Sequence, residues 1–194
     1  DLNILSEEGL RVFAEDKLVG GIQDSFHEFL VKTSNGNPFY LEQILAYFEE
    51  SKMLIIKDGL WDVKDSEIKL PSSMNAILTA RIDRLSTLVK ETVKAAAVIG
   101  REFELPILKE VMKNNEAFIE KNGNVMNVLK EQIQTAEAGQ IWSALSELRY
   151  MFKHSLMRET VYDMQLHTRL RKLHLLIGSA IEELYPNSIE EKYV

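Results

Sequence analysis

The sequence contains no cysteine. Disulfide bridges and thiolate metal ligands are therefore excluded within this chain, and their absence fits a reducing compartment. No apolar run approaches the roughly 20 residues that a membrane-spanning helix requires. The N-terminus also lacks the basic and apolar regions of a signal peptide. We therefore expect a cytoplasmic protein without a membrane partner.

Motifs for catalysis and metal binding are also missing. No glycine is followed by lysine, so the phosphate-binding motif GxxxxGK[ST] does not occur, and HExxH is absent. No strand-like apolar run ends in the adjacent acidic residues that hold magnesium. Among the histidines, His167 and His174 lie two helical turns apart, where they are more typical of surface residues than of metal ligands. The sequence predicts neither catalytic residues nor a metal site.

Basic residues are outnumbered by acidic ones. The chain has 23 Lys and Arg against 30 Asp and Glu, a formal net charge of -7, which argues against general affinity for nucleic acid or anionic membrane. A length of 194 residues with 45% hydrophobic residues allows one domain or two small ones. The sequence begins without methionine and ends without a terminating pattern, so we expect it to be part of a longer protein.

Residues 1–85 are expected to form a helical subdomain. Ser6 followed by two glutamates is typical of a helix start. The clearest signal is Gly36-Asn37-Pro38. Glycine suits the left-handed residue that ends a helix, asparagine suits the N-cap of the next helix, and proline suits its first position. These three residues predict a tight, stiff corner between two helices.

A β-hairpin is predicted at residues 53–64, which project from these helices. The sequence MLIIK is followed by Asp58-Gly59 and then by LWDVK. Asp-Gly is the dipeptide that a two-residue type I′ turn prefers, because both central residues need positive φ. A further helix is expected after Leu70-Pro71, and it carries Arg81 and Arg84.

Residues 86–165 predict a winged-helix-like subdomain. Three helices and then two paired strands are expected at 86–100, 106–111, 125–138, 141–145 and 148–153. A helix through Trp142, Leu145 and Leu148 is the competing interpretation of the first strand. The polar stretch 113–124 is interpreted as a loop or insertion, and residues 166–194 as a C-terminal helix. The predicted fold is mainly α with small β-hairpins.

The end of this subdomain has an unusual local charge. Side chains alternate up to His154 and adopt a helical period from Ser155, so His154 stands where a strand passes into a helix. Backbone N–H groups and the helix dipole at such a point favour an anion, especially a phosphate. Between positions 149 and 174 the sequence has six basic residues and only two acidic ones. A core histidine beside a solvated basic face is the alternative that the residues alone leave open.

Four segments in this order resemble one family. They are NGNPFYLEQIL, LPSSMNAILTARIDRLSTLVKETVKAAAVIGREFELPIL, RYMFKHSLMRETVYD and LRKLH. The family is the STAND class of P-loop ATPases, signal-transduction ATPases with numerous domains. The branch resembled accompanies bacterial adenylate or guanylate cyclase domains and LuxR-type regulators, and tetratricopeptide repeats often follow it. The resemblance covers residues 20–185 and implies the helical lid and winged helix that follow the P-loop core.

The resemblance also implies roles for particular residues. Gly36, Asn37 and Pro38 would form the corner that contacts adenine, and His154 would reach the β-phosphate of bound ADP. ADP or ATP would be the cofactor, with magnesium supplied by the P-loop core. A proline ring can pack on a purine, and an imidazole can donate to a phosphate oxygen. Arg81 matches a recurrent family position whose partner the sequence does not identify, and the insertion between residues 111 and 150 departs from the family pattern.

Three functions follow as hypotheses. The first is a regulatory ADP/ATP switch, not itself catalytic, whose partners are the upstream P-loop core and downstream repeat or effector domains of the same chain. The second is a DNA-binding winged helix with residues 125–138 in the major groove. The charged residues of that segment are Lys130, Glu131 and Glu137, and this composition is unfavourable for phosphate contacts. The third is a protein-interaction scaffold without a nucleotide contact.

Overall fold

The computed structural model describes residues 4–64, 70–71, 73–113, 115 and 125–187. The chain separates into two compact units, residues 1–81 and 82–194, and the division falls inside one helix. The predicted insertion 113–124 lies mostly outside the described residues. Within those residues no helix has the length and apolar character needed to cross a membrane.

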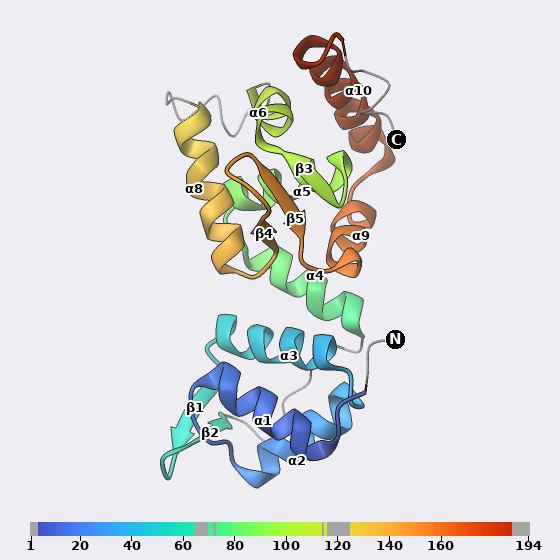
Figure 1. Ribbon diagram of the computed structural model, residues 1–194. Helices are drawn as coiled ribbons and strands as arrows, with labels where there is room; N and C mark the ends of the chain where they lie inside the picture. The colour runs from blue at the N-terminus through green and yellow to red at the C-terminus, as the bar shows by residue number, and fades with distance from the viewer. Residues whose placement is uncertain (1–3, 65–69, 72, 114, 116–124, 188–194) are drawn as a thin grey trace. The chain divides into compact units, whose positions relative to one another are not determined.

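The first unit consists of helices and one hairpin (Figure 1). Ser6 caps the first helix as predicted, because its hydroxyl accepts a hydrogen bond of 3.1 Å from the N–H of Gly9. The elements are α1 (Glu7–Leu18), α2 (Asp24–Ser34), α3 (Pro38–Glu50), β1 (Leu54–Lys57), β2 (Leu60–Val63) and the start of α4 (Met74–Arg84).

The predicted hairpin is confirmed. Strands β1 and β2 are antiparallel, with Leu54 opposite Val63 and Lys57 opposite Leu60. Asp58 has φ 53° and Gly59 has φ 80°, so both central residues take the positive φ that the Asp-Gly pair predicts. The turn chemistry alone therefore explains where the chain reverses.

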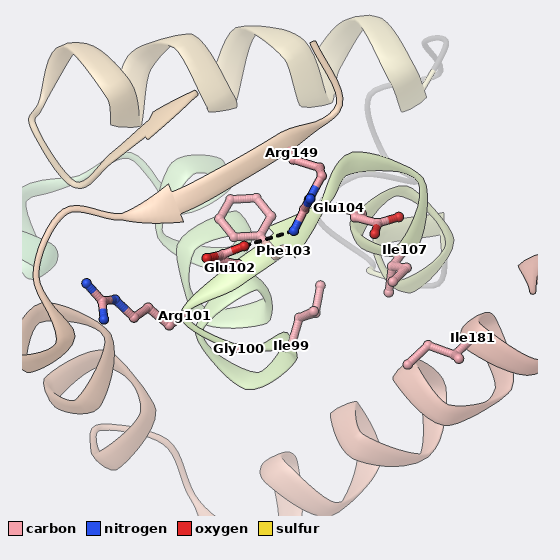
Figure 2. Close-up of a pocket in the computed structure, with 9 residues that line it drawn as sticks. All are labelled: Ile99, Gly100, Arg101, Glu102, Phe103, Glu104, Ile107, Arg149 and Ile181. Atoms are coloured by element: carbon pink, nitrogen blue, oxygen red, sulfur yellow. Dashed lines mark hydrogen bonds and ion pairs between the residues drawn. The ribbon is translucent and has the colours of Figure 1, made fainter. Parts of the chain in front are cut away.

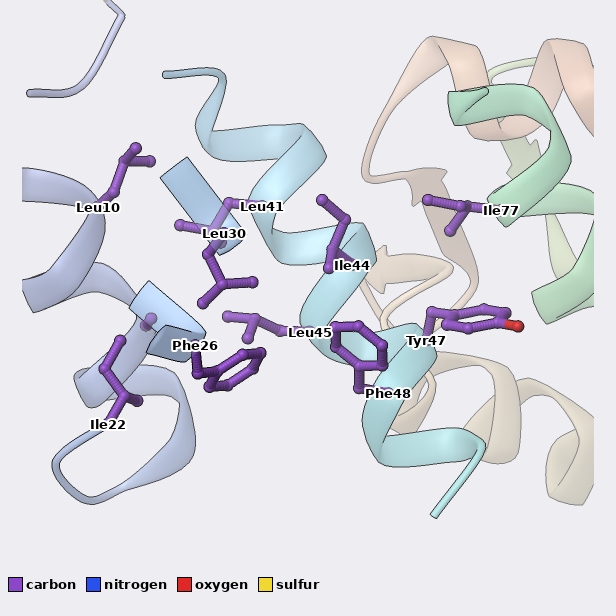
Figure 3. Close-up of a cluster of buried hydrophobic side chains, with 11 residues drawn as sticks. Leu10, Ile22, Phe26, Leu30, Leu41, Ile44, Leu45, Tyr47, Phe48 and Ile77 are labelled. Atoms are coloured by element: carbon purple, nitrogen blue, oxygen red, sulfur yellow. The ribbon is translucent and has the colours of Figure 1, made fainter. Parts of the chain in front are cut away.

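The core of the first unit gathers along α3 (Figure 3). Helix α3 is apolar on most of its circumference, so it is buried between its neighbours instead of lying on one side of them. Phe48 contacts Phe26 edge-on with ring centroids 5.9 Å apart. The buried cluster comprises Leu10, Ala14, Ile22, Phe26, Leu30, Leu41, Ile44, Leu45, Tyr47, Phe48 and Ile77.

The second unit is a winged helix followed by two helices (Figure 1). The three-stranded antiparallel sheet has the order β3-β5-β4, and β4 with β5 forms the wing. The elements are α5 (Thr87–Ile99), β3 (Glu102–Glu104), α6 (Leu105–Lys113), α8 (Val125–Ala138), β4 (Trp142–Ala144), β5 (Arg149–Phe152), α9 (Ser155–Asp163) and α10 (His167–Leu184).

The prediction of a mainly helical chain with small β-hairpins is confirmed. Residues 142–144 form a strand, so the competing helix through Trp142, Leu145 and Leu148 is wrong. The reason lies in the packing. Trp142 is fully buried between Phe103 and Phe152, and its indole N–H donates to the carbonyl of Ile133 at 3.1 Å. Strand β3, which sequence analysis missed, completes this aromatic core.

Candidate functional site

The Gly36-Asn37-Pro38 corner has the predicted local structure. Asn35 (φ 48°) and Gly36 (φ 78°) are both left-handed, and they end α2. The side-chain oxygen of Asn37 accepts a hydrogen bond of 3.1 Å from the N–H of Tyr40, and Pro38 opens α3. The signal that ends α2 and the signal that begins α3 therefore lie within three residues, and the chain turns without a longer loop.

The segment before α1 packs against this corner. The N–H of Leu5 donates to the carbonyl of Gly36 at 2.9 Å. A Cβ atom on Gly36 would lie 2.2 Å from Cγ2 of Ile4 and 3.2 Å from the carbonyl oxygen of Leu5. Glycine is therefore required here both by its positive φ and by the close approach of another segment. Ile4 itself is 78% exposed.

A buried hydroxyl without a partner stands directly before the corner. Ser34 is 1% exposed, and its Oγ makes no hydrogen bond. A buried hydroxyl of this kind calls for a partner such as water or a ligand atom. The corner thus combines a half-buried proline ring and an exposed isoleucine with a buried hydroxyl that has no hydrogen-bond partner.

His154 occupies the predicted junction between a strand and a helix. It is the N-cap residue of α9, with extended backbone (φ -136°, ψ 135°), and its side chain makes no capping hydrogen bond. The residue is half-buried. The N-terminus of α9 therefore provides backbone donors of the kind that favour an anion.

Several basic residues of the segment 149–174 contact other groups of the second unit. Arg158 donates from Nε to the carbonyl of Ala97 at 2.8 Å and lies over the ring of Tyr162, with its guanidinium carbon 5.1 Å from the centroid. Arg169 pairs with Glu91. Arg171 and Lys172, by contrast, are exposed on α10. Much of the local positive charge therefore serves the packing of α9 and α10.

Arg81 is buried in the first unit. It is 4% exposed, and its guanidinium contacts Glu50 and Gln43, both on α3. The sequence left open whether Arg81 meets a nucleotide, another domain or solvent, and the structure assigns it these two partners. Arg81 is therefore part of the packing of α4 on α3.

A cavity of about 320 Å³ opens in the second unit (Figure 2). Ile181 of α10 lies opposite Ile99 and Ile107 across it, and the exposed ion pair Arg149–Glu102 (2.9 Å) stands at its rim. Sequence analysis did not find this cavity, because the residues come from five separate elements and share no motif. It contains neither His154 nor any of the three corner residues.

One titratable group beside this cavity is strongly shifted. The hydroxyl of Tyr185 donates to Oε2 of Glu104 at 2.5 Å. Burial raises the pKa of Tyr185 to about 12, and the hydrogen bond and charge of Glu104 act in the same direction. This bond ties the end of α10 to the junction of β3 and α6.

A smaller cavity of about 250 Å³ lies beside α2 in the first unit, lined by Glu7, His27, Glu28, Val31 and Lys32. Both ring nitrogens of His27 are engaged. Nε2 lies 2.9 Å from the carbonyl of Glu7, and Nδ1 lies 3.2 Å from Nη2 of Arg11. Because a guanidinium only donates, Nδ1 accepts and Nε2 carries the proton. His27 therefore ties α1 to α2.

The predicted site residues fall in two groups. Gly36, Asn37 and Pro38 lie together in the first unit, and His154 lies in the second. In the parts of the chain that the structure describes, no group of three or more His, Cys, Asp or Glu side chains is arranged to hold a metal ion.

Comparison with known proteins identifies a distant relative. The chain is 24% identical over 152 residues to an uncharacterised protein of Rhizobium meliloti (strain 1021). The match covers 78% of this chain and 14% of the relative, so the chain spans a small part of that protein's length. No protein-family model matches the chain.

Proposed function

We propose that the chain is the lid and winged-helix region of a STAND-type signal-transduction ATPase, and that it works as an ADP/ATP switch. The observation that carries the proposal is the order of parts. A helical unit with a Gly-Asn-Pro corner precedes a winged helix in which His154 stands between β5 and α9. The match to a short stretch of a much longer relative supports a module within a larger chain.

In this proposal the nucleotide is ADP, held by a P-loop core outside these residues. Gly36 and Pro38 would approach the adenine, with Pro38 as an apolar surface. His154 would donate to the β-phosphate beside the N-terminus of α9. The nucleotide supplies the charged phosphates, and these residues hold and orient it.

The switch requires a contact that differs between nucleotide states. A ligand shifts a conformational equilibrium only by its differential affinity for the two conformations. If His154 binds phosphate in the ADP state alone, ADP holds the inactive arrangement, and exchange for ATP releases the winged helix. Cytoplasmic repeat or effector domains following α10 would receive the change.

The exposed face of the candidate recognition helix does not favour DNA binding. On α8 the exposed residues Asn127, Lys130, Glu131, Gln134 and Thr135 carry one positive and one negative charge. A helix that reads the major groove presents cations to the flanking phosphates. A nucleotide switch is therefore the better-supported use of this winged helix.

The test is His154→Ala in the full-length protein, with release of a fluorescent ADP analogue as the readout. A hydrogen bond to a charged group contributes about 1.5–3 kcal/mol, so we expect ADP release to be faster by roughly 10–100-fold and basal output to rise. His167→Ala, which removes an exposed histidine of α10, is the matched control. Unchanged ADP release in His154→Ala, with release in the control also unchanged, would remove the sensor role.

A further inference from the structure

The buried guanidinium of Arg81 binds two side chains of the first unit. From α4 its Nε and Nη2 donate to Oε1 of Glu50 at 2.9 and 2.6 Å, and its Nη1 donates to the side-chain oxygen of Gln43. Gln43 is 1% exposed, and the side chain of Glu50 is 31% exposed. One planar guanidinium therefore holds two side chains of a neighbouring helix at once.

The two partners define a position along α3. Gln43 and Glu50 are seven residues apart, which is two helical turns, so they share a face of α3 and lie roughly 10 Å apart along its axis. Both side chains contact the guanidinium of Arg81. Sliding α4 by one turn, or rotating it, would break at least one of these contacts. The contact thus specifies the register of α4 on α3.

The other contacts between these helices are less specific. Ile77 lies in the apolar cluster of the first unit, and Ala80 packs against it. Apolar burial is non-directional and tolerates small shifts. The ion pair between the buried guanidinium and the partly exposed Glu50 is directional, in contrast, and setting a register is the best-attested use of such polar contacts. An arginine at this position is therefore better explained by geometry than by stability.

We propose that Arg81 is the residue that sets the register of α4 against α3. It does so by binding Gln43 and Glu50 simultaneously, a role that does not depend on nucleotide binding. Arg81 is the last residue of the first unit, and the chain enters the second unit within the same helix.

The test measures the register directly. The chain has no cysteine, so Glu49→Cys on α3 and Asn75→Cys on α4, both exposed, accept spin labels without further changes. We expect one narrow distance with Arg81 present. In Arg81→Met, which keeps the length of the side chain but not its donors, we expect a broadened distance or a second population shifted by about 5 Å, one helical turn. Arg81→Lys keeps the charge without the fork and should resemble Arg81→Met.

Two further measurements keep the test decisive. A label pair at Asp16→Cys and Glu49→Cys reports α1 against α3 and should keep its distance in every variant, which shows that the unit is folded. If Arg81→Met unfolds, Glu50→Ala removes one of the two partners and should broaden the distance between α3 and α4. A single, unshifted, narrow distance between α3 and α4 in a folded Arg81→Met or in Glu50→Ala would overturn the proposal.

Discussion

Two glycines with nearly the same backbone conformation allow the close packing at the corner to be measured. Gly36 has φ 78° and Gly59 has φ 80°, and both lie in the first unit. A Cβ on Gly59 would meet no atom within 4 Å, whereas a Cβ on Gly36 would lie 2.2 Å from Ile4. Gly59→Ala therefore tests the backbone conformation alone, and Gly36→Ala tests the conformation and the contact together.

The expected sizes follow from these distances. A left-handed conformation costs a residue with a Cβ about 1–2 kcal/mol, and the reduced freedom of the unfolded chain returns about 0.4–1 kcal/mol. Gly59→Ala should therefore destabilise the first unit by about 1 kcal/mol. Overpacking adds about 1–3 kcal/mol. Because the exposed side chain of Ile4 can turn away, we expect the low end of that range and a total of about 2 kcal/mol for Gly36→Ala.

The measurement is a urea titration of protein labelled with fluorotryptophan. The sequence has two tryptophans, Trp61 in the first unit and Trp142 in the second, so each unit gives its own ¹⁹F resonance. Ile4→Ala combined with Gly36→Ala should recover most of the difference between the two glycine variants. Equal losses for Gly36→Ala and Gly59→Ala would refute the reasoning, because the contact with Ile4 would then carry no energy.

Other consequences can be checked on the same chain. Ser34→Ala should raise the free energy of unfolding of the first unit by about 1 kcal/mol, because it removes a buried hydroxyl without a partner; a loss of stability in urea would contradict this. Asn37→Ala should lower it by about 0.5–2 kcal/mol through loss of the α3 cap, while Asn37→Asp keeps the acceptor and should retain it. The pKa of Tyr185 is raised to about 12, so its contribution to stability is complete below pH 10 and is lost as the pH rises toward 12. Tyr185→Phe should therefore weaken the decline in stability of the second unit over that interval, and an unaltered pH profile would exclude this role.

Features set by neighbouring residues could be predicted from the sequence. The corner depends on the conformational preferences of glycine, asparagine and proline, and the hairpin depends on those of Asp58-Gly59. The junction at His154 was visible because the side-chain period changes there from two to that of a helix. In each case the determining interactions lie within a few residues, so no knowledge of the tertiary structure was needed.

Features set by distant residues were missed. Strand β3 has three residues, and its partner β5 lies more than 40 residues further along the chain, with Glu102 opposite Met151 and Glu104 opposite Arg149. The partners of Arg81 lie 38 and 31 residues away on α3. The cavity beside α10 joins residues from five elements. No local pattern encodes such pairings, because packing of the whole unit brings the residues together.

The local structure also decides which control each variant of a site residue needs. Gly36 is required by its positive φ and by the packing of Ile4, and Asn37 caps α3, so substitutions at these positions change stability whether or not a nucleotide binds. Helix α9 takes no capping hydrogen bond from the side chain of His154, so replacing this side chain removes no cap. Because His154 makes other interactions in the folded protein, a change in ADP release in His154→Ala is assigned to binding only where the free energy of unfolding of the second unit is unchanged. At the corner, the same separation of binding from folding would require Asn37→Asp. Aspartate keeps the cap of α3 and changes the group that the proposed site presents to the base.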